Sequence, residues 1–271
     1  MAANGLDDLY TLLDAELYKS EQDLPLDAIK CPLSPNSRAE VGRALGYRPL
    51  VLLHGWGPPG YSVTRPGIPG QELLRELSTL SHTPYLSVHL DPDPALDGEL
   101  DRSILLERVV EQAGRLRQLS GLPLLLENVP WRPGTEEIGA VRPGFGTDPD
   151  FITAALEVCG AGLLLDLAHA RVACFHRGED VHGYLEALPL SLVRELHVSG
   201  PRLEAGGLRD RHLALHPTDW ALLDWALERT PGVQWLTHEY AGARPETTGY
   251  TADTGPEVLR ADLLHLKERT Q

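Results

Sequence analysis

The sequence predicts an α/β fold: a (β/α) TIM-type barrel formed by one domain over residues 1–271. Short apolar runs that suit buried strands alternate with stretches of helical spacing along the chain, which indicates a parallel sheet with helical crossovers. No change in composition marks a linker, and 271 residues is a common length for such a barrel. No Gly-rich phosphate loop follows any run, so a doubly wound open sheet is the weaker alternative.

Seven strands and eight helices are expected in chain order. The strands cover 27–31, 50–55, 85–90, 124–128, 162–169, 192–200 and 233–240, and the helices cover 7–19, 36–45, 72–80, 103–119, 149–160, 181–188, 218–228 and 256–267. A TIM barrel has eight strands. We therefore expect the first strand to be absent or degenerate near the N-terminus. The seam left by an incomplete barrel would expose a strand edge that could accept a peptide as an added strand.

Capping residues set several of the expected boundaries. Asp148 before Pro149 is typical of a helix N-terminus. Gly46 and Gly121 follow apolar helical stretches and are typical of a helix C-terminus. Pro32 is expected to end the first of the seven strands. Residues 209–212 are expected to lie in a loop.

The charge and the cysteines restrict the possible partners and compartment. The net charge is −15, from 39 acidic and 24 basic residues, and a field of this sign repels phosphate backbones, so nucleic acid is not expected as the main partner. No apolar run of about 18 residues predicts a membrane span, and the N-terminus has no signal-peptide pattern. Three scattered cysteines indicate a reducing compartment, so we expect a cytoplasmic protein.

The stretch 123–130 carries the strongest single functional signal. An apolar run that suits a strand buried on both faces leads directly into Glu127 and Asn128 before Pro130. A carboxylate in that place is unusual because burying a charge is costly without a partner. Taken alone, Glu127 fits an ordinary solvated strand end.

The other strands end in the same way. Nine residues of metal-ligand type lie at six strand ends and one adjoining loop: His54, His89, Glu127, Asp166, His169, His197, Asp210, His212 and Glu239. A single His at a strand end is most often a hydrogen-bonded structural residue, but consecutive strands do not end in His, His, Glu, Asp, His and Glu by chance. In a (β/α) barrel these ends meet at one mouth, where active sites lie.

Metal ions are the expected partners of this set. Converging carboxylates would repel one another and shift their pKa values, and divalent cations remove that conflict. Imidazole and carboxylate without thiolate suit iron, manganese, cobalt or zinc. Nine ligands are too many for one ion and suit two or three.

The order of these ligands resembles the trinuclear site of the xylose-isomerase-like barrels, best known from endonuclease IV, over residues 50–240. The finer sequence is similar to the multinuclear non-haem iron-dependent oxidative enzymes (MNIO). The similar segments are His54-Gly55, Ser87–Leu90, Leu126–Val129, Leu164–Leu167, Glu195–Gly200, Asp210-x-His212 and His238–Tyr240. The resemblance implies an oxidoreductase that uses two or three irons and dioxygen to modify residues, often cysteines, of ribosomally made peptides. It also implies a separate peptide-recognition protein as a partner.

The resemblance further implies three metal positions. The first would be held by His54, His89 and Glu127, the second by Glu127, Asp166, His197 and Glu239 with Glu127 bridging, and the third by His169, Asp210 and His212. His169 departs from the oxidative family, in which Asn is common at this position, and matches the endonuclease pattern.

Catalytic residues other than ligands are expected near the strand ends. The candidates are Asn128, Arg209 and Arg211, with Trp131 and Arg132 close to the chemistry, and each of them also fits loop packing or a solvated charge. The Gly/Pro-rich loop from 131 to 146 is a candidate lid.

Three other functions stay open at this point. A zinc-dependent phosphodiesterase like endonuclease IV would use the same ligands. The negative net charge and the near-absence of lysine argue against it, because binding a phosphate backbone draws on basic residues. A sugar isomerase or epimerase needs only the second group around one metal, and leaves His54, His89, Asp210 and His212 unexplained. A metal-storage or accessory protein would not need so preorganised a barrel.

Overall fold

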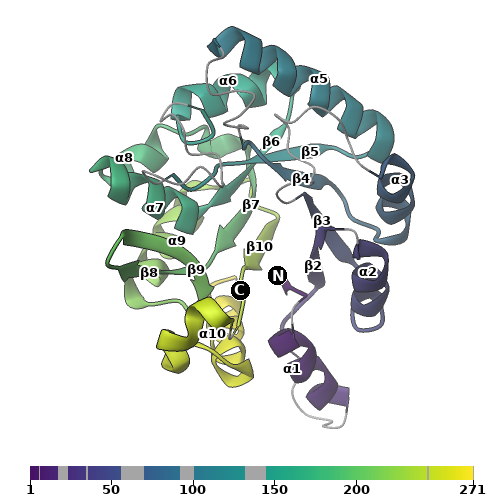
Figure 1. Ribbon diagram of the computed structural model, residues 1–271, viewed down its shortest axis with the longest axis vertical. Helices are drawn as coiled ribbons and strands as arrows, with labels where there is room; N and C mark the ends of the chain where they lie inside the picture. Colours follow the sequence, from purple (N-terminus) through teal and green to yellow (C-terminus); the bar gives the residue numbers. More distant parts are fainter. Residues whose placement is uncertain are drawn as a thin grey trace.

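Eight parallel strands form a closed barrel in this computed structural model, which describes residues 1–5, 7–17, 24–34, 36–55, 70–91, 101–131, 145–242 and 244–270 (Figure 1). The barrel order is β1–β10–β7–β6–β5–β4–β3–β2. The strands are β1 (Ala2–Asn4), β2 (Ala28–Leu33), β3 (Val51–Gly55), β4 (Leu86–His89), β5 (Leu124–Glu127), β6 (Gly162–Asp166), β7 (Val193–Val198) and β10 (Trp235–His238). The predicted TIM-type barrel is confirmed.

The first strand is present and closes the barrel. β1 pairs in parallel with both β2 and β10, so the eight barrel strands leave no open seam. The expectation of a free strand edge for peptide addition at that seam is therefore wrong. β1 is only three residues long and holds two buried alanines, so it lacks the long apolar run that identified the other strands.

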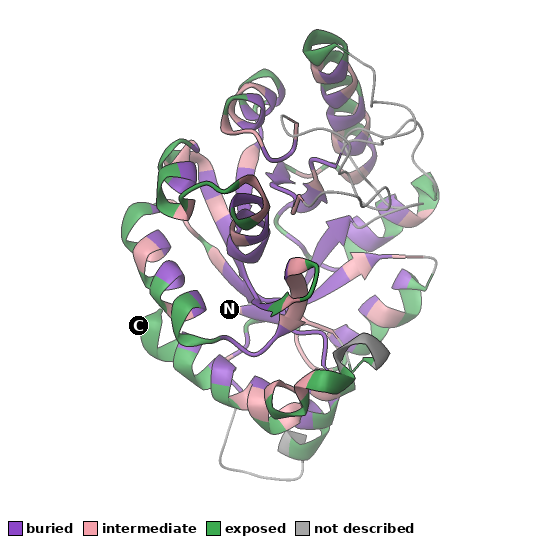
Figure 2. Ribbon diagram, turned by 60° about the vertical axis from the view of Figure 1, so that its left-hand side comes forward, coloured by how far each residue is buried: buried purple, intermediate pink, exposed green. Residues whose placement is uncertain are grey.

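Helices surround the barrel, with buried faces toward the strands and exposed faces outward (Figures 1 and 2). They are α1 (Asp7–Leu17), α2 (Ser37–Leu45), α3 (Gln71–Leu80), α5 (Arg102–Ser120), α6 (Pro149–Cys159), α7 (Leu167–Arg177), α8 (Val181–Glu186), α9 (Pro217–Arg229) and α10 (Pro256–Arg269), with 3₁₀ helices η1 (Leu190–Leu192) and η2 (Pro245–Asp253). None of the helices in the described ranges is long and apolar enough to cross a membrane.

Three local expectations are corrected. Pro32 does not end β2 but lies within it, opposite His54 of β3. The strand expected over 162–169 stops at Asp166, where α7 begins, so His169 lies in the first turn of a helix. The segment 209–212 is not a loop but part of an antiparallel hairpin, β8 (Gly200–Glu204) with β9 (Gly207–Leu213).

Apolar side chains fill both sides of the barrel wall. The larger cluster lies between strands and helices. A smaller one contains Ala2, Ala28, Leu52, Tyr85, Leu125 and Leu164. Leu52, Leu125 and Leu164 lie two residues before His54, Glu127 and Asp166. Because strand side chains alternate with a period of two, the smaller cluster fills the barrel interior and supports those polar residues from below.

Candidate metal centre

The structure brings all nine expected ligand residues together at the C-terminal end of the barrel, in three groups of potential metal ligands. Six of them come from the ends of β3, β4, β5, β6, β7 and β10. His169 comes from α7, and Asp210 and His212 come from β9. Most are buried; His89 and His212 are the most accessible, with 15% and 29% of the side chain exposed.

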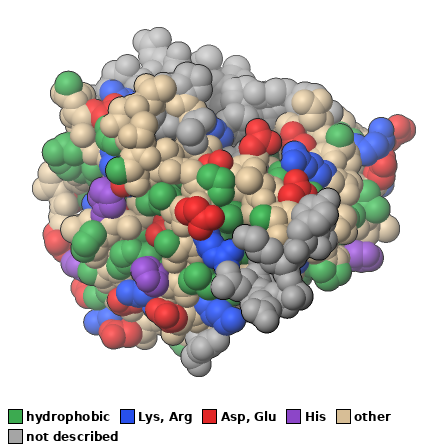
Figure 3. Space-filling model, turned by 90° about the horizontal axis from the view of Figure 1, so that it is seen from below, with side chains coloured by type: hydrophobic (Ala, Val, Ile, Leu, Met, Phe, Trp, Pro, Cys, Tyr) green, Lys and Arg blue, Asp and Glu red, His purple; other side chains and the backbone are tan. Residues whose placement is uncertain are grey.

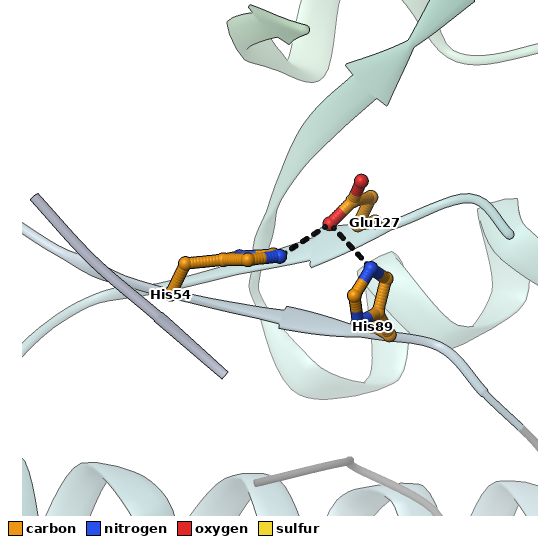
Figure 4. Close-up of side chains that lie close together, drawn as sticks. All are labelled: His54, His89 and Glu127. Atoms are coloured by element: carbon orange, nitrogen blue, oxygen red, sulfur yellow. Dashed lines mark ion pairs between the residues drawn. The ribbon is translucent and has the colours of Figure 1, made fainter. Parts of the chain in front are cut away.

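The first group is His54, His89 and Glu127. Nε2 of His54 and Nε2 of His89 each lie 3.3 Å from Oε2 of Glu127, and both rings point toward that oxygen (Figure 4). Ser87 Oγ lies 2.9 Å from Nδ1 of His54. Since Nδ1 of His54 is engaged there, Nε2 is the ring nitrogen presented to Glu127.

The second group is Glu127, Asp166, His197 and Glu239. Nδ1 of His197 lies 3.5 Å from Oε1 of Glu127, 3.7 Å from Oδ2 of Asp166 and 3.2 Å from Oε1 of Glu239. Glu127 thus turns one oxygen toward each of the first two groups, which is the geometry of a bridging carboxylate.

The third group is His169, Asp210 and His212. Oδ2 of Asp210 lies 3.3 Å from Nε2 of His169 and 2.7 Å from Nε2 of His212. His212 has a φ of 52°, a left-handed conformation that is uncommon outside glycine and tends to occur at functional sites. Its carbonyl accepts a hydrogen bond from Ala241 N, 2.8 Å away, which holds this backbone in place.

Asp166 and Asn128 fix one another at the start of α7. The Asn128 side chain donates to Asp166 O and accepts from Asp166 N, over 2.9 and 2.8 Å. Oδ1 of Asp166 caps α7 by accepting from His169 N, which leaves Oδ2 facing the second group. The Asn128 carbonyl lies 2.8 Å from Nδ1 of His169. Asn128 therefore positions two of the candidate ligands.

Unpaired buried atoms show that the site fits metal ions. Both carboxylate oxygens of Glu127, Oδ2 of Asp166 and Nδ1 of His197 are buried without a hydrogen-bond partner among the described residues. Leaving such atoms unpaired is costly. Cations in the first and second groups would together satisfy all four, and their chemistry is that of nitrogen and oxygen ligands without thiolate.

The charges inside the cluster shift its pKa values strongly. Burial alone would raise the pKa of Glu127, but the imidazoles of His89 and His54 outweigh it and hold this pKa well below its usual range. Burial opposes protonation of His169, yet Asp166 and Asp210 raise its pKa. Burial likewise opposes protonation of His212, but Asp210 raises its pKa to about 9. Without metal, protons on His169, His197 and His212 therefore offset the charge of the carboxylates.

The expected catalytic arginines lie on the hairpin. Arg211 forms a two-pronged ion pair with Glu204, over 2.6 and 2.7 Å. Arg209 and Arg211 alternate along β9 with Asp210 and His212, the two residues of the third group. Strand alternation therefore directs the arginines toward the opposite face of the hairpin. Trp131 packs edge-on against His176. Arg132 and nearly all of the expected lid lie outside the described residues.

Ser87, which orients His54, is a site residue outside the set expected from the sequence. A usable signal was present, because Ser87 lies two positions before His89 and so faces the same side of β4. Polar residues two positions before a ligand are candidates for such supporting contacts.

The fold is shared with solved structures of other proteins. Endonuclease IV from Thermus thermophilus matches with a TM-score of 0.52 and 20% identity over 97% of this chain and 99% of that chain. The IolI protein, whose structure holds a zinc atom, matches with a TM-score of 0.61 and 15% identity over 99% and 95% of the two chains. At these identities the likeness shows the fold alone.

Sequence comparisons with a family model and with relatives identify the family. The UPF0276 protein of Bordetella pertussis strain Tohama I is 33% identical over 158 residues, which cover 55% of this chain and 52% of the relative. The chain thus matches about half the length of such curated relatives. A family model described as the RiPP precursor modification enzyme MbnB/TglH/ChrH matches residues 102–249, more than half of the chain. By that match, this chain belongs to the MbnB/TglH/ChrH family of RiPP precursor modification enzymes.

Proposed function

We propose that this chain is a multinuclear non-haem iron-dependent oxidase or oxygenase that uses dioxygen to modify a residue, expected to be cysteine, of a ribosomally made peptide. The observation that carries the proposal is the pair of groups joined by Glu127, whose two oxygens face different sets of ligands. Membership of a family of peptide-modifying enzymes supports a peptide as the substrate.

Two or three ions are proposed, in the positions of the three groups. His54, His89 and Glu127 would hold the first and Glu127, Asp166, His197 and Glu239 the second, while His169, Asp210 and His212 would hold the third. The ligands also suit zinc or manganese. Bound iron would supply dioxygen activation and one-electron chemistry.

The residues of this chain would bind and orient the substrate at the metal centre. The deeply buried ligands exclude water from the second group, where His197 and Asp166 are fully buried. The centre is most accessible at His89 and His212. A substrate thiolate would therefore approach on the side of the first and third groups. We propose that a separate protein delivers the peptide to this side.

Metal analysis and a coupled peptide assay test the proposal. Protein purified without oxygen and loaded with Fe(II) is incubated, with and without dioxygen, with cysteine-containing precursor peptides encoded beside its gene. We expect at least two irons per chain and a peptide mass change only when dioxygen is present. Absence of iron binding together with an unchanged peptide mass would reject the function.

Zinc-dependent phosphodiester cleavage is the second candidate. His169 completes a third group that contains two imidazoles and one carboxylate, and the fold is shared with endonuclease IV. Against it, the net charge is −15, and acidic and basic side chains are interspersed on the face shown in Figure 3, whereas duplex binding draws on clustered basic residues. Cleavage of abasic-site DNA by the zinc-loaded protein, abolished in Glu127→Gln, would favour this candidate over the first.

A further inference from the structure

A buried ion pair lies beneath the second group, inside the barrel. Lys30 of β2 donates to Oε1 of Glu195 on β7 over 2.8 Å, and the two side chains are 1% and 0% exposed. Thr237 of β10 donates to the same oxygen over 2.6 Å. Buried ion pairs often contribute little to stability, because desolvation offsets their attraction. A role other than stability therefore has to be considered for this pair.

The pair touches the rear of His197. Nε2 of His197 lies 2.5 Å from Lys30 Nζ and 3.3 Å from Glu195 Oε1. The opposite ring nitrogen, Nδ1, faces Glu127, Asp166 and Glu239. Glu195 lies two residues before His197 on the same strand, so both side chains point into the barrel.

The chemistry of the pair suits both states of the ring. An ammonium group only donates hydrogen bonds, and a carboxylate only accepts them. When Nδ1 carries the proton, Nε2 can accept from Lys30. When Nδ1 is bound to a metal, the proton of the neutral ring is on Nε2, where Glu195 can accept it and the Lys30 ammonium cannot. Each state of the ring thus has one suitable partner: Lys30 when Nδ1 carries the proton, and Glu195 when Nδ1 binds a metal.

We infer that Lys30 and Glu195 are positioning residues that hold His197 with Nδ1 directed at the second metal position. This inference rests on the proposed metal centre and deepens it. It gives two residues that are not ligands the role of orienting His197, which belongs to the second group alone. Partners of this kind typically change metal affinity by about 10–100-fold.

Paired variants separate positioning from stability. Removing one partner would leave a buried charge uncompensated and destabilise the fold, so both are changed together. Lys30→Met with Glu195→Met removes both contacts with His197. Lys30→Met with Glu195→Gln removes the charges but keeps an acceptor oxygen for Nε2. Thr230→Val is the control, since the buried Thr230 hydroxyl donates to the Ala226 carbonyl at the C-terminal end of α9.

Zinc titration against a chromophoric chelator measures the affinity of each position, and the visible spectrum of the cobalt-loaded protein reports its coordination. We expect the Met/Met variant to bind the second ion about 10–100-fold more weakly, with an altered cobalt spectrum, and the Met/Gln variant to recover part of that loss. Wild-type affinity in Met/Met, or an equal loss in Thr230→Val, would overturn the inference. If the wild type itself binds no zinc or cobalt, the proposed metal centre fails instead.

Discussion

Glu127 is the residue on which the arrangement of the first two groups depends. Its two oxygens face different ligands: Oε2 faces His54 and His89, and Oε1 faces His197. A carboxylate that binds two cations is not available as a general base. A role as a base at this position would require the metal positions to be empty.

The Glu127→Gln variant should lose metal from two positions at once. A neutral amide replaces the shared anionic ligand, so both the first and the second groups are weakened, while His212→Ala weakens only the third. Metal content measured by mass spectrometry of equilibrated protein, alongside a folding check by circular dichroism, distinguishes the two variants. Loss of a single ion in Glu127→Gln would contradict the bridging assignment.

Metal binding to the third group should release protons. Asp210 raises the pKa of His212 to about 9, so this imidazole is protonated in metal-free protein at neutral pH, and a metal ligand must be deprotonated. The apparent affinity is therefore expected to rise with pH until about pH 9, by about tenfold per unit for each proton released. Zinc calorimetry in buffers of different ionisation enthalpy counts the protons, with His212→Ala as the control. A pH-independent affinity between about pH 7 and pH 9 would contradict this.

At the scale of elements, the junction of β6 with α7 combines a helix cap with a candidate ligand. One oxygen of Asp166 caps the helix and the other faces the second group. The helix then carries His169 into the third group from its first turn. A single residue therefore links the formation of α7 to the geometry of two groups.

Asp166→Asn and Asp166→Ala should separate these two roles. Asparagine caps a helix about as well as aspartate, so the metal-free Asn variant should keep its free energy of unfolding, whereas Ala should lose about 1 kcal/mol. Both variants should bind metal at the second position at least about tenfold more weakly, because Asp166 is a proposed ligand and loss of a residue that merely supports a ligand already costs about that much. Urea unfolding of the metal-free proteins and zinc titration measure the two effects. Equal stability of the Asn and Ala variants would show that the cap is unimportant.

The hairpin β8–β9 is the other element that shapes the centre. It brings Asp210 and His212 back over the barrel mouth, and Ser199 donates to Oδ1 of Asp210 over 3.0 Å. Gly200 allows this close approach, because a Cβ at that position would lie 2.0 Å from the Ala214 carbonyl oxygen. The third group thus depends on how the hairpin folds back.

At the scale of the whole molecule, the closed barrel holds a concentrated set of buried charges that metal-free protein must tolerate. The candidate ligand residues of β3 through β10 lie at one end of a ring that β1 closes between β10 and β2. Metal binding should therefore stabilise the entire fold, since unfolding separates the ligands.

Metal removal should lower the melting temperature of the protein. A ligand that binds only the folded state, at about 100 times its Kd, adds about 2.7 kcal/mol per site, and about 2–4 °C of Tm accompanies each kcal/mol for a protein near this size. Calorimetry of chelator-treated and Fe(II)- or zinc-loaded protein tests this. Metal loading should raise the melting temperature of Glu127→Gln by less than that of the wild type. Identical melting temperatures with and without metal would contradict it.

The sequence by itself predicted the barrel class and nine candidate ligand residues that the fold brings together at the barrel mouth. Buried parallel strands appear as apolar runs, and a strand period of two makes the polar residue at the end of each run face the mouth. Both signals are local, so they can be read without knowing which strands are neighbours. The N-cap of α6, Asp148, could be predicted for the same reason.

Only the tertiary structure decided how those residues are grouped. The three-residue strand β1 forms because it pairs with β2 and β10, and its own sequence carries no strong strand pattern. The turn of Glu127 toward two groups and the approach of Lys30 to His197 likewise join segments far apart in the chain. These contacts depend on the closure of the barrel, which no local pattern of residues encodes.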